Sequence, residues 1–336
     1  MSVQPELWLY GSIRIRSMES RMIGRAGLER LLEAGSPARC AALLPELGVE
    51  TVTDPASGAL LREETLSLRL RRAYSEALAA AEDADFLRLW LYPYDCNNIK
   101  AAVKCFRRGA DVNGLLFDFG TVERERILAV AAGHSEAAGL PAPFGEAAEE
   151  AADAFARTGN PQRVDLLLDR ACYRAMLAEA AGSGEEFCLR LVREKIDLTN
   201  LMTCLRLLRM GGASAVGELL PEALLEGGTL PPADLVARCA GGEQAFCAWL
   251  PLSDYRIFAA ALPGPGGSLS AAQTAADNQW MERIREAKMV PYGPPPLIGY
   301  LLGSEYEVRN LRILLAGLEA GLPAATLRER MRESYV

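Results

Sequence analysis

Three stretches of the sequence share one pattern: YDCNNIKAAVKCFRRG (94–109), IDLTNLMTCLRLLRMG (196–211) and YEVRNLRILLAGLEAG (306–321). Each has an Asn, a carboxylate three positions before it, a Gly eleven positions after it, and apolar residues at offsets one, five and eight. These offsets place the apolar residues on one face of a helix, and the Gly is where that helix would end in a left-handed conformation. The carboxylates are Asp95, Asp197 and Glu307, the asparagines are Asn98, Asn200 and Asn310, and the glycines are Gly109, Gly211 and Gly321.

The recurrence of this pattern predicts an internal triplication. The chain has only seven Asn residues, and three of them stand in this one context, 102 and 110 residues apart. Such spacings are the size of a domain and far exceed the period of a solenoid repeat. Helical sequences precede each motif at 71–81, 170–181 and, with weaker similarity, 278–288, so each unit would contain a helical hairpin. We therefore predict three similar helical domains at residues 1–112, 113–213 and 214–336.

The composition favours an all-α fold. Half of the 336 residues are hydrophobic and 24% are charged, the balance of folded globular domains. Ala, Leu, Glu and Arg are abundant, whereas β-branched and aromatic residues are sparse, and these preferences favour helix. The eight Cys residues are scattered without a CxxC pair or a regular framework, so we expect reduced thiols in the core.

Charge and hydropathy limit the possible partners. A net charge of -8 argues against binding nucleic acid through its phosphates. The basic cluster Arg69, Arg71 and Arg72 could form a local footing on anionic lipid, but a solvated helix face is the simpler interpretation. The N-terminus has neither a leader nor an anchor pattern, and the longest uncharged run, 257–276, contains Pro and Gly residues that exclude a spanning helix. Any membrane association is expected to occur through partners, without direct insertion.

The motifs of catalysis and cofactor binding are absent from the sequence. It contains no GxxxxGK[ST] phosphate loop, no GxGxxG dinucleotide motif and no GxSxG elbow. The single histidine, His134, lies in a loop-like stretch, so we expect no histidine-based triad, and the chain alone cannot form a multi-histidine metal site. We expect no catalytic residues, no cofactor and no metal.

The repeated polar residues admit two interpretations. A carboxylate and an Asn three positions apart share a helix face and could recognise a ligand. Alternatively they are structural: Asp95, just after Pro93, could cap its own helix with support from Asn98. Glu307 is a poorer cap and would instead meet an Arg or Lys of the packed hairpin. Repetition in every domain favours the structural interpretation.

At these segments the sequence resembles the C subunit of V-type and A-type ATPases and ATP synthases, which is related to the d subunit of the eukaryotic vacuolar enzyme. The resemblance rests on YPYDCNNIKAAVK (92–104), LVREKIDLTNLMTCLRL (191–207) and, most strongly, PPPLIGYLLGSEYEVRNLRILLAGLEAGLP (294–323). Two positions after the Asn, the family tends to have a basic or polar residue. The first and third copies have Lys100 and Arg312 there, whereas the middle copy has Met202 and departs from the family.

The resemblance implies three helical domains arranged as a pseudo-threefold funnel. It also implies a non-catalytic, cytoplasmic central-stalk subunit, peripheral to the membrane through its complex. Such a subunit couples the rotating shaft to the membrane proteolipid ring for proton or sodium transport, so its partners are the shaft subunits and that ring. Two alternatives remain open, a generic helical adaptor without a rotary role and an enzyme with a cryptic site in an all-α fold.

Overall fold

The computed structural model describes residues 8–80, 84–134, 139–142, 144–260, 262 and 264–336, with backbone alone for 212–215 and 218. These residues form helices and no β-strand, apart from one isolated antiparallel bridge between Thr53 and Leu60. The predicted all-α class is confirmed.

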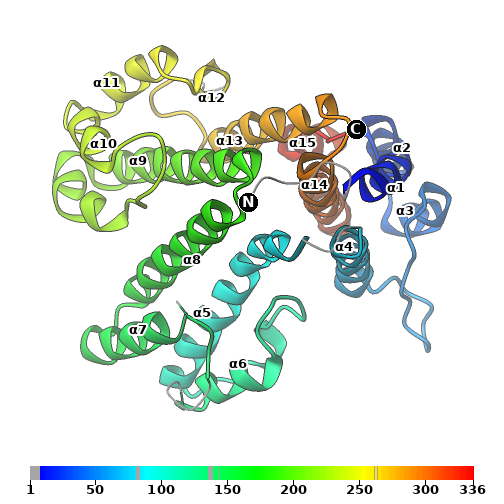
Figure 1. Cartoon of the computed structure of the whole chain (residues 1–336), viewed down its shortest axis with the longest axis horizontal. Helices are drawn as coiled ribbons and strands as arrows, with labels where there is room; N and C mark the ends of the chain where they lie inside the picture. Colours follow the sequence, from blue (N-terminus) through cyan, green and yellow to red (C-terminus); the bar gives the residue numbers. More distant parts are fainter. Residues whose placement is uncertain (1–7, 81–83, 135–138, 143, 261, 263) are drawn as a thin grey trace. The chain divides into compact units, whose positions relative to one another are not determined.

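The helices divide by their contacts into two compact units. Unit 1 comprises Met1–Asp85, Cys204–Ala215 and Ala237–Val336, and unit 2 comprises Phe86–Thr203 and Val216–Val236. The helices of the described chain, drawn in Figure 1, are α1 Leu9–Glu19, α2 Arg25–Ala34, α3 Pro37–Leu43, α4 Arg62–Leu78, α5 Tyr92–Arg108, α6 Arg124–Ala131, α7 Phe144–Thr158, α8 Pro161–Ser183, α9 Glu186–Ala223, α10 Pro232–Cys239, α11 Gly242–Trp249, α12 Arg256–Ala260, α13 Leu269–Arg285, α14 Pro294–Glu319 and α15 Ala324–Arg330. Short 3₁₀ turns lie at Pro45–Leu47, Ala84–Leu91, Asn113–Leu115, Leu250–Leu252 and Glu286–Met289.

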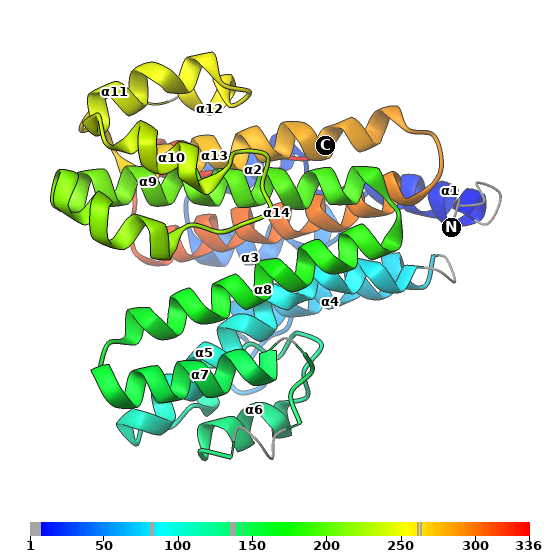
Figure 2. The same ribbon diagram turned by 60° about the vertical axis from the view of Figure 1, so that its left-hand side comes forward.

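Unit 1 is built around α14, which is buried on nearly every side. This helix packs against α4, α1 and α13 and also contacts α2, α3 and α15; Figures 1 and 2 both show it alongside α4. Every residue from Pro294 to Ser304 is buried, as expected for a helix segment inside a core, and Leu301, Leu302 and Leu311 are fully buried. Pro294 occupies the first position of α14, where its missing N–H is no loss because that amide would have no partner in the helix.

Unit 2 is centred on the helix α5, which packs against α6, α7 and α8. The hairpin of α7 and α8 turns at Asn160, whose side chain accepts a hydrogen bond from the N–H of Gln162. Pro161 follows as the first residue of α8. An Asn cap followed by Pro is a strong signal for a helix start, so this corner is determined by local sequence.

The predicted helices before each motif are present as α4, α8 and α13, although residue 81 of the first stretch lies outside the described residues. Two of the three predicted glycine ends are also confirmed. Gly109 follows α5 with φ 60°, and Gly321 lies just beyond α14 with φ 71°. The prediction for Gly211 is wrong, because α9 continues through it to Ala223.

The structure also shows the surroundings of the cysteines and of the histidine. All eight cysteines are free thiols, seven of them buried and Cys247 half-buried. His134 is exposed, and the residues that follow it, 135–138, lie outside the described part of the chain. Among the helices described, none combines the length and apolarity needed to cross a bilayer.

Candidate functional site: the repeated asparagine and carboxylate positions

The three repeated Asn side chains make the same pair of hydrogen bonds. In each case the side-chain amide nitrogen donates to a backbone carbonyl, and the N–H of that same residue donates back to the side-chain oxygen. The partners are Phe117 for Asn98 (3.0 and 2.8 Å), Leu225 for Asn200 (2.8 and 2.8 Å) and Arg332 for Asn310 (2.9 and 2.8 Å). We call each pair an asparagine clamp. It imitates the exchange of two hydrogen bonds between paired strand residues, and it satisfies both backbone groups of an irregular segment.

The carboxylates of the first two copies bind the same loop as the clamp, a few residues further along the chain. Asp95 accepts hydrogen bonds from the N–H of Thr121 (2.8 Å), the N–H of Val122 (3.0 Å) and the Thr121 hydroxyl (2.6 Å). Both carboxylate oxygens of Asp95 are therefore used. Burial raises the pKa of Asp95, against the opposing effect of these donors.

Asp197 repeats this arrangement in the second copy. It accepts hydrogen bonds from the N–H of Thr229 (2.8 Å), the N–H of Leu230 (3.0 Å) and the Thr229 hydroxyl. In both copies the Thr stands four residues after the backbone partner of the clamp, Phe117 or Leu225. The two loops thus dock on their helices with equivalent contacts.

A Gly precedes each of these Thr residues because no side chain fits there. A Cβ at Gly120 would lie 2.2 Å from Oδ1 of Asp95, and one at Gly228 would lie 2.1 Å from Oδ1 of Asp197. The sequence contains two Gly-Thr dipeptides, and both lie at these loops. This recurrence was the available signal for the loop residues, which the helix-centred alignment missed.

The third carboxylate has different partners. Glu307 accepts a hydrogen bond from the N–H of Ile23, and the Arg69 guanidinium lies against it with Nε and Nη2 both 2.8 Å from Oε1. Burial raises the pKa of Glu307, while the Arg69 charge opposes that shift. The expectation that Glu307 meets a basic residue is confirmed. That partner belongs to α4, which packs against α14, rather than to the preceding helix α13.

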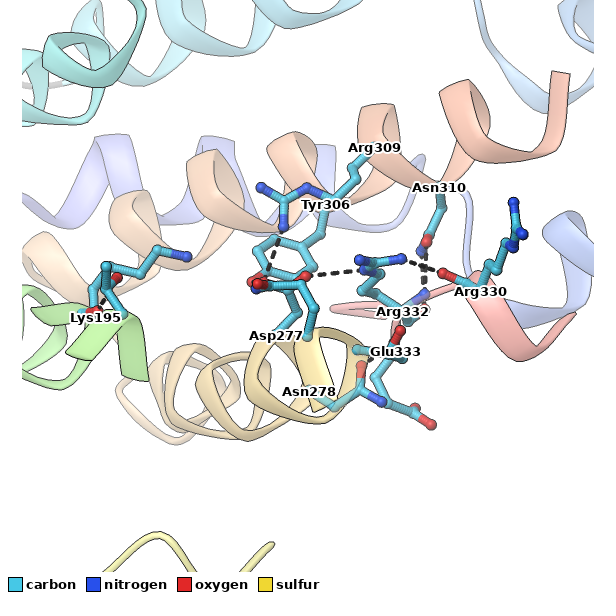
Figure 3. Close-up of polar contacts among 12 residues, drawn as sticks. Lys195, Asp277, Asn278, Tyr306, Arg309, Asn310, Arg330, Arg332 and Glu333 are labelled. Atoms are coloured by element: carbon cyan, nitrogen blue, oxygen red, sulfur yellow. Dashed lines mark hydrogen bonds and ion pairs between the residues drawn. The ribbon is translucent and has the colours of Figure 1, made fainter. Parts of the chain in front are cut away.

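A buried polar cluster that was not predicted from the sequence surrounds the third clamp (Figure 3). Asp277 on α13 is 3% exposed and lies 3.0 Å from Nε of Arg332 and 3.1 Å from Nη1 of Arg309. The Tyr306 hydroxyl donates to Asp277 at 3.3 Å, and burial raises the pKa of Tyr306. A buried carboxylate needs such partners, so Asp277 and the clamp together fix the segment that contains Arg332.

Other predictions about these residues need correction. Asp95 does not cap its own helix: α5 already begins at Tyr92, and the carboxylate caps a loop instead. Arg69 is not part of a solvated face, since its side chain is 17% exposed and paired with buried Glu307. Arg72 does match that interpretation, because it is 62% exposed and pairs with equally exposed Glu50.

The chemistry of these positions is that of hydrogen-bonded anchors. Each clamp and carboxylate is engaged by backbone groups or a guanidinium, an arrangement that holds segments in place. Within the part of the chain that the structure describes, no group of three or more His, Cys, Asp or Glu side chains is placed to hold a metal ion. The positions therefore define helices whose long connections are tied back onto them at recurring sites.

Comparison with known proteins identifies the class. A sequence model of the ATP synthase (C/AC39) subunit family matches residues 13–330, which include all three Asn positions of the clamps and all three carboxylates. The chain belongs to this family. The match also shows that it is a subunit of the V-type and A-type rotary ATPases, as the resemblance implied.

Individual relatives cover nearly the whole chain. The A-type ATP synthase C subunit of Haloferax volcanii is 25% identical, over 93% of this chain and 94% of its own. The A-type ATP synthase C subunit of Haloquadratum walsbyi is 26% identical, over 96% and 97%. The V-type sodium ATPase C subunit of Enterococcus hirae is 23% identical, over 81% and 82%.

Proposed function

We propose that this chain is a non-catalytic central-stalk subunit that couples the rotating shaft of a V/A-type ATPase to its membrane proteolipid ring. In this role it transmits torque for the movement of protons or sodium ions. It works on the cytoplasmic face of the membrane, and its partners are the shaft subunits and the ring. The observation that carries the proposal is the family match over residues 13–330, together with relatives named as the C subunits of such complexes.

The clamps suit a part that transmits force without yielding. A coupling subunit must resist deformation, and close-packed helices with satisfied buried polar groups are stiff. Each clamp joins a helix to a segment 19 to 25 residues further along the chain. These ties are placed where an irregular connection would otherwise move independently of its helix.

The proposal includes a threefold architecture. We propose three helical domains, predicted at residues 1–112, 113–213 and 214–336, related by triplication and arranged as a funnel. We propose a second boundary further along the chain than predicted, because α9 continues to Ala223 and its Asn200 is clamped to Leu225. The recurring clamp supports the threefold architecture, because Asn98, Asn200 and Asn310 hold their partners with the same two hydrogen bonds. A structure of the assembled complex tests it directly: the three clamps should surround a single axis, and a linear arrangement would contradict the funnel.

Reconstitution tests the coupling role. A rotary complex assembled without this chain should hydrolyse ATP but fail to move ions, and adding the chain back should restore ion transport. The chain should also co-purify with proteolipid ring and shaft subunits. If the complex without it still transports ions at the normal ratio to ATP, the chain is an adaptor without a coupling role.

A further inference from the structure

The joint between α5 and α8 in unit 2 brings two buried thiols together. One face of α5 lies along α8: Lys100 Nζ is 2.6 Å from Asp169 Oδ1, and Lys104 pairs with Asp165. These two ion pairs fix an antiparallel register, since the residue numbers rise along α5 as they fall along α8. The thiols lie within this register.

Cys96 stands one helical turn before Lys100 on the same face of α5. Its Sγ is 3.4 Å from the carbonyl oxygen of Leu168 and 3.8 Å from Asp169 Oδ1. Cys172 follows Leu168 by four residues, one turn further along α8, which is where the antiparallel register places a neighbour of Cys96. Both cysteines are 2% exposed.

Cys96 also affects the protonation of Cys172. Hydrogen bonding with Cys96, followed by burial, raises the pKa of Cys172. We therefore assign Cys172 as the resolving thiol and Cys96 as the attacking sulfur. A metal would need further ligands, and the described residues supply no group of three.

We propose that Cys96 and Cys172 are a redox-sensitive pair that forms a disulfide across the α5–α8 joint when a peroxide reaches it. The Cys96 thiolate attacks the peroxide to give a sulfenic acid, and Cys172 then displaces water from that sulfur. Two thiols and one hydrogen peroxide give one disulfide and two water molecules. The inference does not depend on the rotary role.

The bond would tie together the ends of a long segment. Residues 96 to 172 include α6 and α7, so closing this loop restricts the unfolded chain and stabilises unit 2. Both helices already meet at the cysteines, so the oxidised and reduced forms should keep the same fold. The disulfide would thus hold α5 and α8 together without changing the fold.

Peptide mapping of the full-length protein tests the proposal. The native chain is treated with hydrogen peroxide, free thiols are alkylated in denaturant, and the non-reduced protein is digested with trypsin. We expect LWLYPYDCNNIK (89–100) to be linked to ACYR (171–174), with a loss of about 2 Da relative to the separate peptides that reverses on reduction. The oxidised protein should also melt several degrees higher, on the order of 5 °C.

Matched variants separate this pair from the other thiols. Cys105→Ala alters another buried thiol on α5 and should leave both the linked peptide and the melting shift unchanged. Cys96→Ser and Cys172→Ser should each abolish both. The proposal is overturned if wild-type Cys96 is recovered alkylated, bonded to a different cysteine, or oxidised to sulfinic acid while Cys172 remains alkylated. The wild-type map decides this even where a variant fails to fold.

Discussion

Replacing Asn200 by Ala should destabilise the protein more than the same change at Asn98, although both residues make the same clamp. Asn200 is fully buried and its partner Leu225 is 4% exposed. Without the amide, the N–H and carbonyl of Leu225 are left unsatisfied where water cannot reach them. Each such group costs about 1–3 kcal/mol, so we expect a loss of about 3 kcal/mol after the helix preference for Ala is allowed for.

The cost at Asn98 should be smaller because Phe117 is 48% exposed. Water can replace the lost hydrogen bonds there, and we expect Asn98→Ala to cost about 1 kcal/mol. Asn97, the adjacent residue on α5, is exposed and provides a matched control. Asn97→Ala should change stability by less than about 0.5 kcal/mol.

Two measurements check this ranking. Urea unfolding followed by circular dichroism gives the free energy of unfolding for each variant. Hydrogen exchange at the Leu225 amide reports the clamp locally, and a loss of about 3 kcal/mol corresponds to roughly a hundredfold faster exchange. If Asn200→Ala is as mild as Asn97→Ala, or leaves exchange at Leu225 unchanged, the clamp does not stabilise the loop and our reasoning fails.

Two further substitutions and a change of pH should each alter the stability of the protein in a defined direction. Gly228→Ala should cost about 2 kcal/mol or more in urea unfolding, because its Cβ would lie 2.1 Å from Asp197, whereas Gly217→Ala, with open space around the Cβ, should be neutral or stabilising. Tyr335→Ala should lower the free energy of unfolding by about 3–4 kcal/mol, because the ring is 2% exposed and packs on Gly299 and Gly303; equal stability of variant and wild type would contradict that packing. Burial raises the pKa of Asp95 in the folded state, so the proton binds more tightly there than in the unfolded chain. The stability that Asp95 contributes is therefore full at low pH and is lost as the pH rises through its folded pKa. Wild type should accordingly lose stability relative to Asp95→Asn as the pH rises above about 4, the ordinary value for Asp, and parallel curves would refute this.

The helices that carry the motifs could be predicted from the sequence because their causes are local. Apolar residues at helical spacing defined the faces, and Gly109 and Gly321 adopt the left-handed conformation that ends a helix. Gly211 has the same place in the pattern, yet α9 continues past it. Val216 and Leu220 are buried further along α9. Burial of each contributes about 1.5–3 kcal/mol, which offsets the cost of about 1 kcal/mol for each of Gly211, Gly212 and Gly217 inside the helix.

The partners of the motif could not be predicted from helix periodicity, because they lie in irregular segments. Asp95 meets Thr121 and Asn98 meets Phe117, contacts that depend on how the chain returns after α5. No pattern with a period of 3.6 extends into such a segment. What does recur is the Gly-Thr dipeptide, whose Gly is required by the space that the carboxylate occupies.

In the third copy the carboxylate belongs to a Glu rather than an Asp, and its partners differ. In the first two copies a Thr four residues after the clamp partner donates to the Asp, but the position four residues after Arg332 is occupied by Val336, which has no side-chain donor. The carboxylate there meets the Ile23 N–H and the Arg69 guanidinium instead, and both come from other elements of unit 1. The Glu side chain reaches both of these partners. The same helix position therefore ties a sequential loop in two copies and a distant segment in the third, while the Asn keeps one function in all three.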